Sequence, residues 1–172
     1  MHTPHESVPL PERTKSHVSV LWGQATRETR LLCHVHRVVG RYMHWGDRHS
    51  ELCLLPEQPC PHCADGKKRL WYGWLFGRND ISGGAALLQL TLTAVRSNLS
   101  LSDPNCDLRG AKIELFRQAD RTGSLVTAKV HLSRNPDRFT KDEPDVLEHL
   151  FRFYRLPLYR SAAIAADQDG AL

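Results

Sequence analysis

Three cysteines near the middle of the chain most constrain how this sequence can fold. Cys53, Cys60 and Cys63 form a Cys-x6-Cys-x2-Cys pattern, and His44 stands nine positions before the first of them. A Cys-x2-Cys turn lets two thiolates reach one ion at about 2.3 Å, and two further nitrogen or sulfur ligands complete a tetrahedron. The pattern therefore predicts an insertion, residues 44–66, that is held together by a structural zinc ion.

The fourth ligand of this predicted zinc site stays open at the level of sequence. His44 is our first choice, and we predict the ligand set His44, Cys53, Cys60 and Cys63. The other candidates for the fourth position are His49, His36, His34 and Cys33. His62 lies inside the Cys-x2-Cys loop, where we expect its side chain to point away.

Two other chemistries use similar residues. The Cys60-Pro61-His62-Cys63 tetrapeptide occurs in oxidising thioredoxin-fold proteins, where a buried strand precedes it and a long helix follows and lowers the thiol pKa. Here a proline-rich stretch precedes it and a turn follows. Zinc deaminases combine H-x-E with a later P-C-x-x-C. His49-Ser50-Glu51 and Pro59-Cys60 match these, but only seven residues separate Glu51 from Pro59. Both alternatives leave Cys53 without a role.

Composition places the chain among ordinary globular proteins. It has 172 residues, 41% hydrophobic and 24% charged, with a formal net charge of +4, which suits one domain and permits a polyanionic partner. There is no apolar run of membrane-spanning length and no secretory signal segment, so we expect no membrane partner. We therefore expect a cytoplasmic protein, associated with the nucleoid in a bacterium, whose clustered cysteines bind metal rather than form disulfides.

Period-2 alternation of apolar and polar residues predicts a mainly β fold. The predicted strands are residues 31–42, 69–76, 86–95, 112–116 and 125–132. A 3.6-residue stripe predicts one helix at about residues 142–156, with Thr140-x-x-Glu143 as its capping box. Short strands and one terminal helix favour an OB-like small barrel. We expect a flexible arm over residues 1–17, the barrel over 18–161 and a flexible tail over 162–172.

Basic and aromatic residues interleave directly after the cysteine cluster, in Lys67-Lys68-Arg69-Leu70-Trp71-Tyr72-Gly73-Trp74. Proteins that bind single strands follow the phosphates with cations and stack bases on exposed rings. On a strand, Trp71 shares a face with Arg69, which predicts a solvent-facing ring. Trp74 shares its face with Leu70 and Tyr72, which predicts a core position. Trp45 in the insertion is a further candidate contact.

A second concentration of basic residues follows later in the chain. Residues 109–138 contain seven lysines and arginines against three acids. A local excess of this kind indicates a groove for a polyanion. The predicted nucleic-acid contacts in this region are Arg109, Lys112, Arg117, Arg121 and Lys129.

The order His44, Cys53, Cys60, Cys63, followed by Trp71 to Phe76 and a turn at Asp80, resembles the zinc-containing single-stranded-DNA-binding proteins of T-even-type phages. The resemblance covers about residues 44–80. It implies a zinc subdomain inserted in an OB fold, these four residues as ligands, and the Trp71–Trp74 strand beside a DNA cleft. The ligand spacings here are shorter, and residues 1–17 hold no counterpart of the family's basic cooperativity motif.

We therefore expect a protein without enzymatic activity that binds single-stranded nucleic acid, with DNA implied by the resemblance. Its partners would then include replication, recombination or mobile-element proteins. The alternative is a zinc-knuckle module that binds protein within a larger nucleic-acid-processing complex. A zinc-dependent nucleobase deaminase is the third hypothesis.

Overall fold

The computed structural model of the protein describes residues 18–24, 28–45, 50–118, 125–139 and 142–154. The predicted arm 1–17 and tail 162–172 lie outside these ranges. His49, Arg121 and Thr140, to which the sequence pattern assigns roles, also lie outside these ranges.

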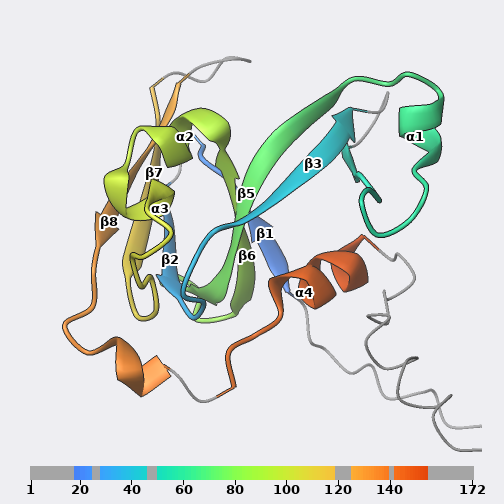
Figure 1. Ribbon diagram of the computed structural model, residues 1–172. Coiled ribbons are helices and arrows are strands. Elements are labelled where there is room, and N and C mark those ends of the chain that lie inside the picture. Colours follow the sequence, from blue (N-terminus) through green and yellow to red (C-terminus); the bar gives the residue numbers. More distant parts are fainter. Residues whose placement is uncertain (1–17, 25–27, 46–49, 119–124, 140–141, 155–172) are drawn as a thin grey trace, which may run out of the picture.

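Within the described residues, eight strands form one open sheet (Figure 1). They are β1 (Ser19–Leu21), β2 (Thr29–Cys33), β3 (Val39–Trp45), β4 (Ser50–Leu52), β5 (Arg69–Asn79), β6 (Ala85–Thr91), β7 (Lys112–Arg117) and β8 (Val126–His131). The main path through the sheet is β1-β6-β5-β2-β7-β8, while β3 pairs with β5 and β4 pairs with β3. The β1–β6 pair is parallel and the other pairs are antiparallel. The prediction of a mainly β protein is confirmed.

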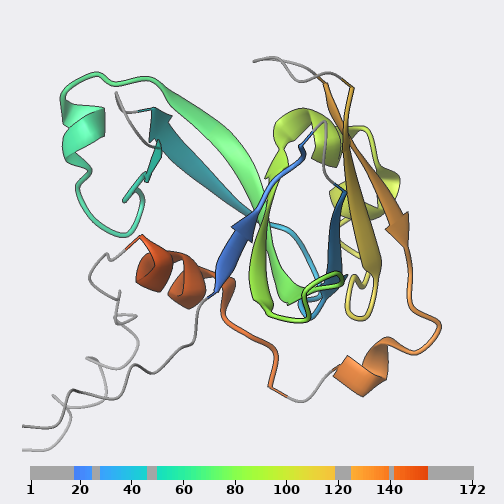
Figure 2. The same cartoon turned by 180° about the vertical axis from the view of Figure 1, so that it is seen from behind.

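Short helices connect and cover the sheet. They are α1 (Pro61–Ala64), α2 (Leu92–Arg96), α3 (Leu99–Ser102), the 3-10 turn η1 (Pro136–Phe139) and α4 (Val146–Phe153). Helix α4 contacts β5 and β6 and lies beneath the point where β3 and β5 leave the body (Figures 1 and 2). No helix in these ranges is both long and apolar enough to cross a membrane.

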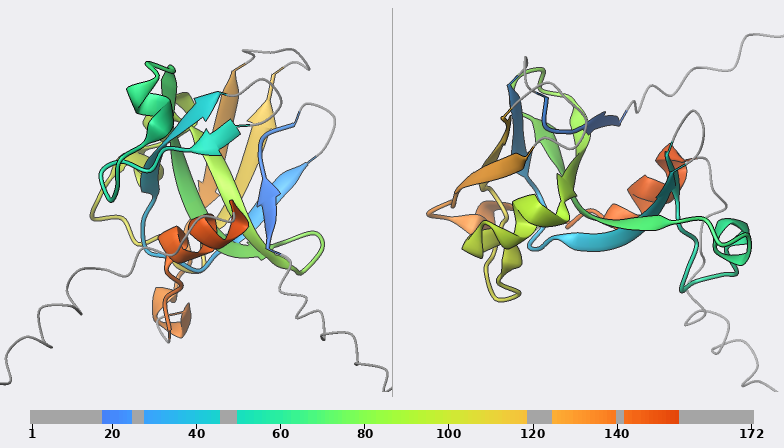
Figure 3. Two further views of the ribbon diagram at one scale, coloured as in Figure 1. Left: turned by 90° about the vertical axis from the view of Figure 1, so that its right-hand side faces the viewer. Right: turned by 90° about the horizontal axis from the view of Figure 1, so that it is seen from above.

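The longest strand, β5, joins two parts of the molecule. Its first half pairs with β3, with Arg69 opposite His44, and its last residues pair with β2. Strand β6 runs along its other edge from Tyr72 to Arg78. Strand β3 and the start of β5 therefore project from the body as a ribbon that is two-stranded from Tyr42 and Trp71 outward, with β4 and α1 at its far end (Figure 3). We call this part the β3–β5 ribbon.

Two predicted strands are shorter than the sequence pattern indicated. The predicted strand 31–42 divides into β2 and β3, because residues 34–38 leave the sheet and the backbone N–H of Leu108 donates to the carbonyl of His36 (2.9 Å). The predicted strand 86–95 ends at Thr91. The hydroxyl of Thr91 accepts a hydrogen bond from the backbone N–H of Ala94 (3.1 Å) and so begins α2.

The predicted helix 142–156 begins later than the capping-box pattern indicated. The carboxylate of Asp145 accepts hydrogen bonds from the backbone N–H groups of Leu147 (2.8 Å) and Glu148 (3.2 Å), so α4 begins at Val146. Asp142 has a φ of 59°, which is incompatible with a right-handed helix. The proposed capping residue Thr140 lies outside the described residues.

One apolar core lies between the sheet and the helices. The completely buried side chains of the sheet include Leu31, Trp74, Leu88 and Ile113, and Leu150 of α4 joins them. The predicted core position of Trp74 is confirmed, since its side chain is 0% exposed. Because β5 carries this core at one end and the ribbon at the other, the core fixes the direction in which the ribbon projects.

Candidate metal centre

The four predicted ligands come together at the far end of the ribbon. The ligand atoms of His44, Cys53, Cys60 and Cys63 all lie within 4.8 Å of one another. His44 Nε2 lies 3.4 Å from the sulfur atoms of both Cys60 and Cys63, and the sulfur atoms of Cys53 and Cys63 are 3.6 Å apart. A tetrahedron with ligand distances of 2.0–2.3 Å has edges of about 3.3–3.8 Å. The donor set and its spacing are therefore compatible with one zinc ion.

Two strands and one turn of helix deliver these donors. His44 lies near the end of β3, opposite Glu51 of β4. Cys53 directly follows β4, and its backbone N–H donates to the carbonyl of Tyr42 (2.9 Å). Cys60 and Cys63 lie at the start and in the middle of the α1 turn, which Gly66 closes with a positive φ of 69°. The left-handed conformation suits glycine and turns the chain back into β5.

A buried ion pair ties the loop between Cys53 and Cys60 to the ribbon. The guanidinium of Arg41 in β3 donates to the carbonyl of Leu55 (3.3 Å) and to the carboxylate of Glu57. Burial raises the pKa of Glu57, but its hydrogen bonds with Arg41 outweigh that effect and hold the pKa below its ordinary value. The loop is thus fixed by a salt bridge on one side and by the ligand cluster on the other.

The thiols of the cluster titrate very differently from one another. Burial opposes ionisation of Cys60, but two backbone amides and the neighbouring thiols donate to its sulfur and lower its pKa to about 7. Burial and the two adjacent thiols raise the pKa of Cys63 to about 11. The cluster therefore stabilises one thiolate readily and resists the ionisation of a second. A divalent cation would offset the repulsion between neighbouring thiolates.

The other candidates for the fourth ligand are engaged elsewhere or lie outside the described residues. The imidazole of His36 contacts the carboxylate of Glu143, and the ring of His34 lies 5.9 Å from that of Phe139. Cys33 is fully buried, and burial raises its pKa to about 12. His62 forms a salt bridge with Glu51 and does not belong to the ligand group. His49 is outside the described ranges.

The aromatic and basic candidates of the ribbon lie on the strands that lead to this cluster. The guanidinium of Arg69 lies over the ring of Tyr42, 4.4 Å from its centroid. Trp71 is half-buried rather than fully solvent-facing, because it packs against the core and the backbone of Gly40. Trp45 at the end of β3 is 57% exposed. The exposed residues Lys67, Lys68 and Arg69 follow one another into β5.

The second basic group does not gather on one face. Arg109 is held by Asp107, the ammonium of Lys112 lies 3.5 Å from Asp80, and Arg117 donates to the carbonyl of Gly23 (2.7 Å). Lys129 lies over the ring of Phe116, at 5.4 Å from its centroid. Arg121 lies outside the described residues. These basic residues are close in sequence, but strand alternation and their separate partners place them in different surroundings.

Tyr42 is the residue of this surface that sequence analysis missed. It lies directly opposite Trp71 in the β3–β5 pair. The sequence indicates only that Tyr42 belongs to a predicted strand. That Trp71 lies opposite Tyr42 depends on the register of the strand pair, which the local pattern does not define.

Comparisons of the chain with protein-family models, with curated proteins and with solved structures found no match. The features of the molecule that bear on its function are the ligand cluster and the surface of the ribbon beside it.

Proposed function

We propose that the protein binds single-stranded nucleic acid along the β3–β5 ribbon and that a zinc ion holds the end of the ribbon in shape. The observation that carries this proposal is the position of Arg69 and Trp71. They lie on the same face of β5, directly beside the ligand cluster. A cation next to an accessible ring, with Lys67 and Lys68 exposed just before them, suits phosphates and bases together.

The ligand geometry supports a structural rather than a catalytic metal. Four protein donors complete a tetrahedron, whereas catalytic zinc sites keep one position open for water. In the deaminase hypothesis a free glutamate acts as acid and base. Here the carboxylate of Glu51 is engaged with His62. When bound, zinc would link the β3–β4 end of the ribbon to the α1 turn, and we propose no reaction there.

We further propose that the sheet is an OB-like barrel with an inserted zinc subdomain. Strands β2 and β3 support this, because they pair with the two ends of β5 as one bent strand does. If β2 and β3 count as one bent strand, the long strands in chain order are β2–β3, β5, β6, β7 and β8. Helices α2 and α3 then lie between the third and the fourth of them, β6 and β7. Gly23, just after β1, approaches Val126 of β8, which brings the two edges of the sheet near each other. The barrel would then be only partly closed, as OB folds are.

The resemblance to the T-even-type phage proteins remains part of this proposal. It favours DNA over RNA and replication, recombination or mobile-element proteins as partners. The ligand order and the strand after it support the resemblance over about residues 44–80.

A salt titration of oligonucleotide binding tests the proposal. We expect the logarithm of the association constant for oligothymidylate to fall linearly with the logarithm of the salt concentration, since bound cations release counterions. Lys68→Ala should reduce the magnitude of this slope by about 0.7, the value for one phosphate contact on a single strand. Arg152→Ala on α4, whose side chain pairs with Glu148, is the matched control and should leave the slope unchanged.

The outcome decides between the leading hypotheses. Binding without salt dependence, or no binding at all, would remove the nucleic-acid function. The protein-interaction hypothesis would then explain the exposed end of the ribbon.

A further inference from the structure

One face of the ribbon carries three successive cross-strand pairs that together form a surface. From the metal centre toward the body they are His44 with Arg69, Tyr42 with Trp71, and Gly40 with Gly73. Residues directly opposite each other on an antiparallel pair have Cβ atoms about 4.5–5.5 Å apart. The two aromatic rings therefore start from adjacent points on the same face.

The glycine pair lies against one edge of the indole of Trp71. A Cβ atom at Gly40 would lie 2.6–2.8 Å from Trp71 Nε1, Cζ2 and Cε2. A Cβ at Gly73 would lie 3.2 Å from Trp71 Cη2. Cε2, which is bonded to both of the other atoms, is the farthest of the three, so the edge of the indole from Nε1 to Cζ2, rather than one of its faces, lies against Gly40. The two glycines therefore make room for an edge of the ring and so position it.

Tyr42 and Arg69 continue this surface toward the metal centre. Tyr42 is 41% exposed, and the guanidinium of Arg69 lies over one face of its ring. In the described part of the chain, no carboxylate lies within ion-pair distance of Arg69. Glu51, which lies opposite His44 in the β3–β4 pair, is engaged with His62. The face is therefore basic and aromatic, and its complement is an anionic chain with flat rings.

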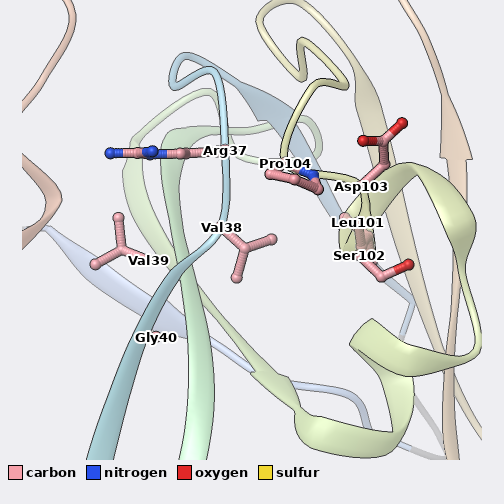
Figure 4. A pocket seen from close by; sticks show the side chains of 8 residues that line it. All are labelled: Arg37, Val38, Val39, Gly40, Leu101, Ser102, Asp103 and Pro104. Atoms are coloured by element: carbon pink, nitrogen blue, oxygen red, sulfur yellow. The ribbon is translucent and has the colours of Figure 1, made fainter.

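Toward the body, the surface continues into a pocket of about 410 Å³ beyond Gly40 (Figure 4). Residues 37–40 form one wall, and the segment from Leu101 to Pro104 forms the other. Val38 points toward this second wall, whereas Arg37 points away from it. Gly40, which lies against Trp71, therefore also belongs to the lining of this pocket.

We infer that Tyr42 and Trp71 form a two-ring stacking site for two neighbouring bases of a single-stranded nucleic acid, with Arg69 beside them for the phosphate and Gly40 as the residue that positions Trp71. This inference rests on the proposed function and adds the site and the number of bases. Stacking on two adjacent rings tolerates any base, because every base has an aromatic face.

The test compares two ligands of equal length, oligothymidylate and a chain of abasic sugar-phosphates. Tyr42→Ala and Trp71→Ala should each weaken oligothymidylate binding about 5- to 140-fold, the equivalent of about 1–3 kcal/mol per base. Neither should change the affinity for the abasic chain by more than about twofold. Arg69→Ala should weaken binding of both ligands. Tyr42→Phe keeps the ring and should bind oligothymidylate like the wild type.

A glycine variant tests the positioning role without removing a ring. Gly40→Ala places a methyl group against the indole and should weaken oligothymidylate binding but not abasic-chain binding. Gly84→Ala, where the nearest atom to the new Cβ lies 3.8 Å away, is the control and should change neither. Thermal unfolding of Tyr42→Ala, whose side chain is exposed, should match the wild type, so its loss of affinity is not a loss of fold.

The outcomes separate this inference from the proposed function. If the wild-type protein does not bind oligothymidylate, the proposed function fails. If it binds but Tyr42→Ala binds equally well, or loses affinity equally for the abasic chain, the stacking site is wrong and the function stands.

Discussion

Two tryptophans three positions apart have different environments in this protein. Trp74 is completely buried and makes an edge contact with Tyr154, with the ring centroids 6.5 Å apart at 83°. Trp71 lies on the opposite face of β5, over Gly40. Strand alternation alone produces this difference, because side chains three positions apart point to opposite faces. The same residue type is therefore completely buried at one position and only half-buried at the other.

Replacement of the buried tryptophan should cost stability. We expect Trp74→Ala to lower the free energy of unfolding by about 3–5 kcal/mol, since it removes a large buried ring and leaves a cavity. Urea unfolding followed by circular dichroism measures this. Trp45→Ala, at a site that is 57% exposed, is the control and should change the free energy by less than about 1 kcal/mol. Equal effects of the two substitutions would contradict the assignment of the core.

Helix α4 shows how one element is attached to the sheet. Val146, Leu150 and Phe151 are buried on one side of the helix. On the same helix, the imidazole of His149 stacks on Phe76 of β5, with centroids 4.0 Å apart and rings tilted by 9°. The attachment therefore combines apolar burial, which does not depend on pH, with a titratable ring.

Acidification should weaken this attachment. Burial lowers the pKa of His149 below its ordinary value of 6.5; the nearby Arg152 also lowers it, and Glu148 and Asp145 raise it. The folded state therefore prefers neutral imidazole. Its contribution to stability is fully present above about pH 6.5 and is lost as pH falls through the lower folded pKa. Burial and Arg78 lower the pKa of His34, which acts in the same direction.

The measurement is the urea midpoint between pH 7.5 and pH 5.5 for the wild type and for His149→Gln. The comparison between the two proteins is needed because acid also protonates the thiolates of the metal centre. The wild-type midpoint should fall more steeply than that of the variant, and the exposed His131→Gln should behave like the wild type. Parallel curves for the wild type and His149→Gln would contradict the prediction.

The whole molecule consists of a body with an apolar core and a ribbon end with few apolar contacts. The core lies mainly among β2, β5, β6, β7 and α4, and Met43 of β3 and Leu52 of β4 extend it toward the ribbon. In the insertion, Leu54 is half-buried and Leu55 is 38% exposed. The ligand cluster and the Arg41–Glu57 pair are the main contacts that fix this end. The two parts should therefore lose structure under different conditions.

Removal of the metal should affect only the ribbon end. Elemental analysis of the purified protein should give about one zinc per chain. A chelator should then make residues 44–68 sensitive to trypsin, because metal binding supplies the folding energy of a segment without its own core. The body and α4 should survive. Mass spectrometry of the fragments locates the cleavage sites, for example after Lys67 and Lys68.

A double variant provides the control for chelation. Cys60→Ser combined with Cys63→Ser should show the cleavage pattern of the chelated protein without any chelator. Retention of one zinc by this variant, or an unchanged cleavage pattern after chelation, would contradict the metal-folded insertion.

The sequence by itself determined the cysteines of the cluster and most of the strands. Cys53, Cys60 and Cys63 were predictable because ligands to one ion must lie within a few ångströms, and short loops between cysteines meet that requirement locally. The sequence ranked His44 first among several candidates for the fourth position, and the fold brought it to the cysteines. Alternation predicted strands wherever one face is buried, and it also placed Trp74 in the core. These features depend on spacing along the chain, which the sequence contains directly.

Only the tertiary structure decided where the strands break and which side chains meet. The chain leaves the sheet at residues 34–38 because of contacts with Leu108 and Glu143, more than 70 residues away in sequence. The pairing of Tyr42 with Trp71 depends on the register of β3 on β5. Arg117 donates to the carbonyl of Gly23, 94 residues away in sequence, a contact that charge counting does not reveal. Register and contacts of this kind arise between distant segments, and a local pattern of residues does not define them.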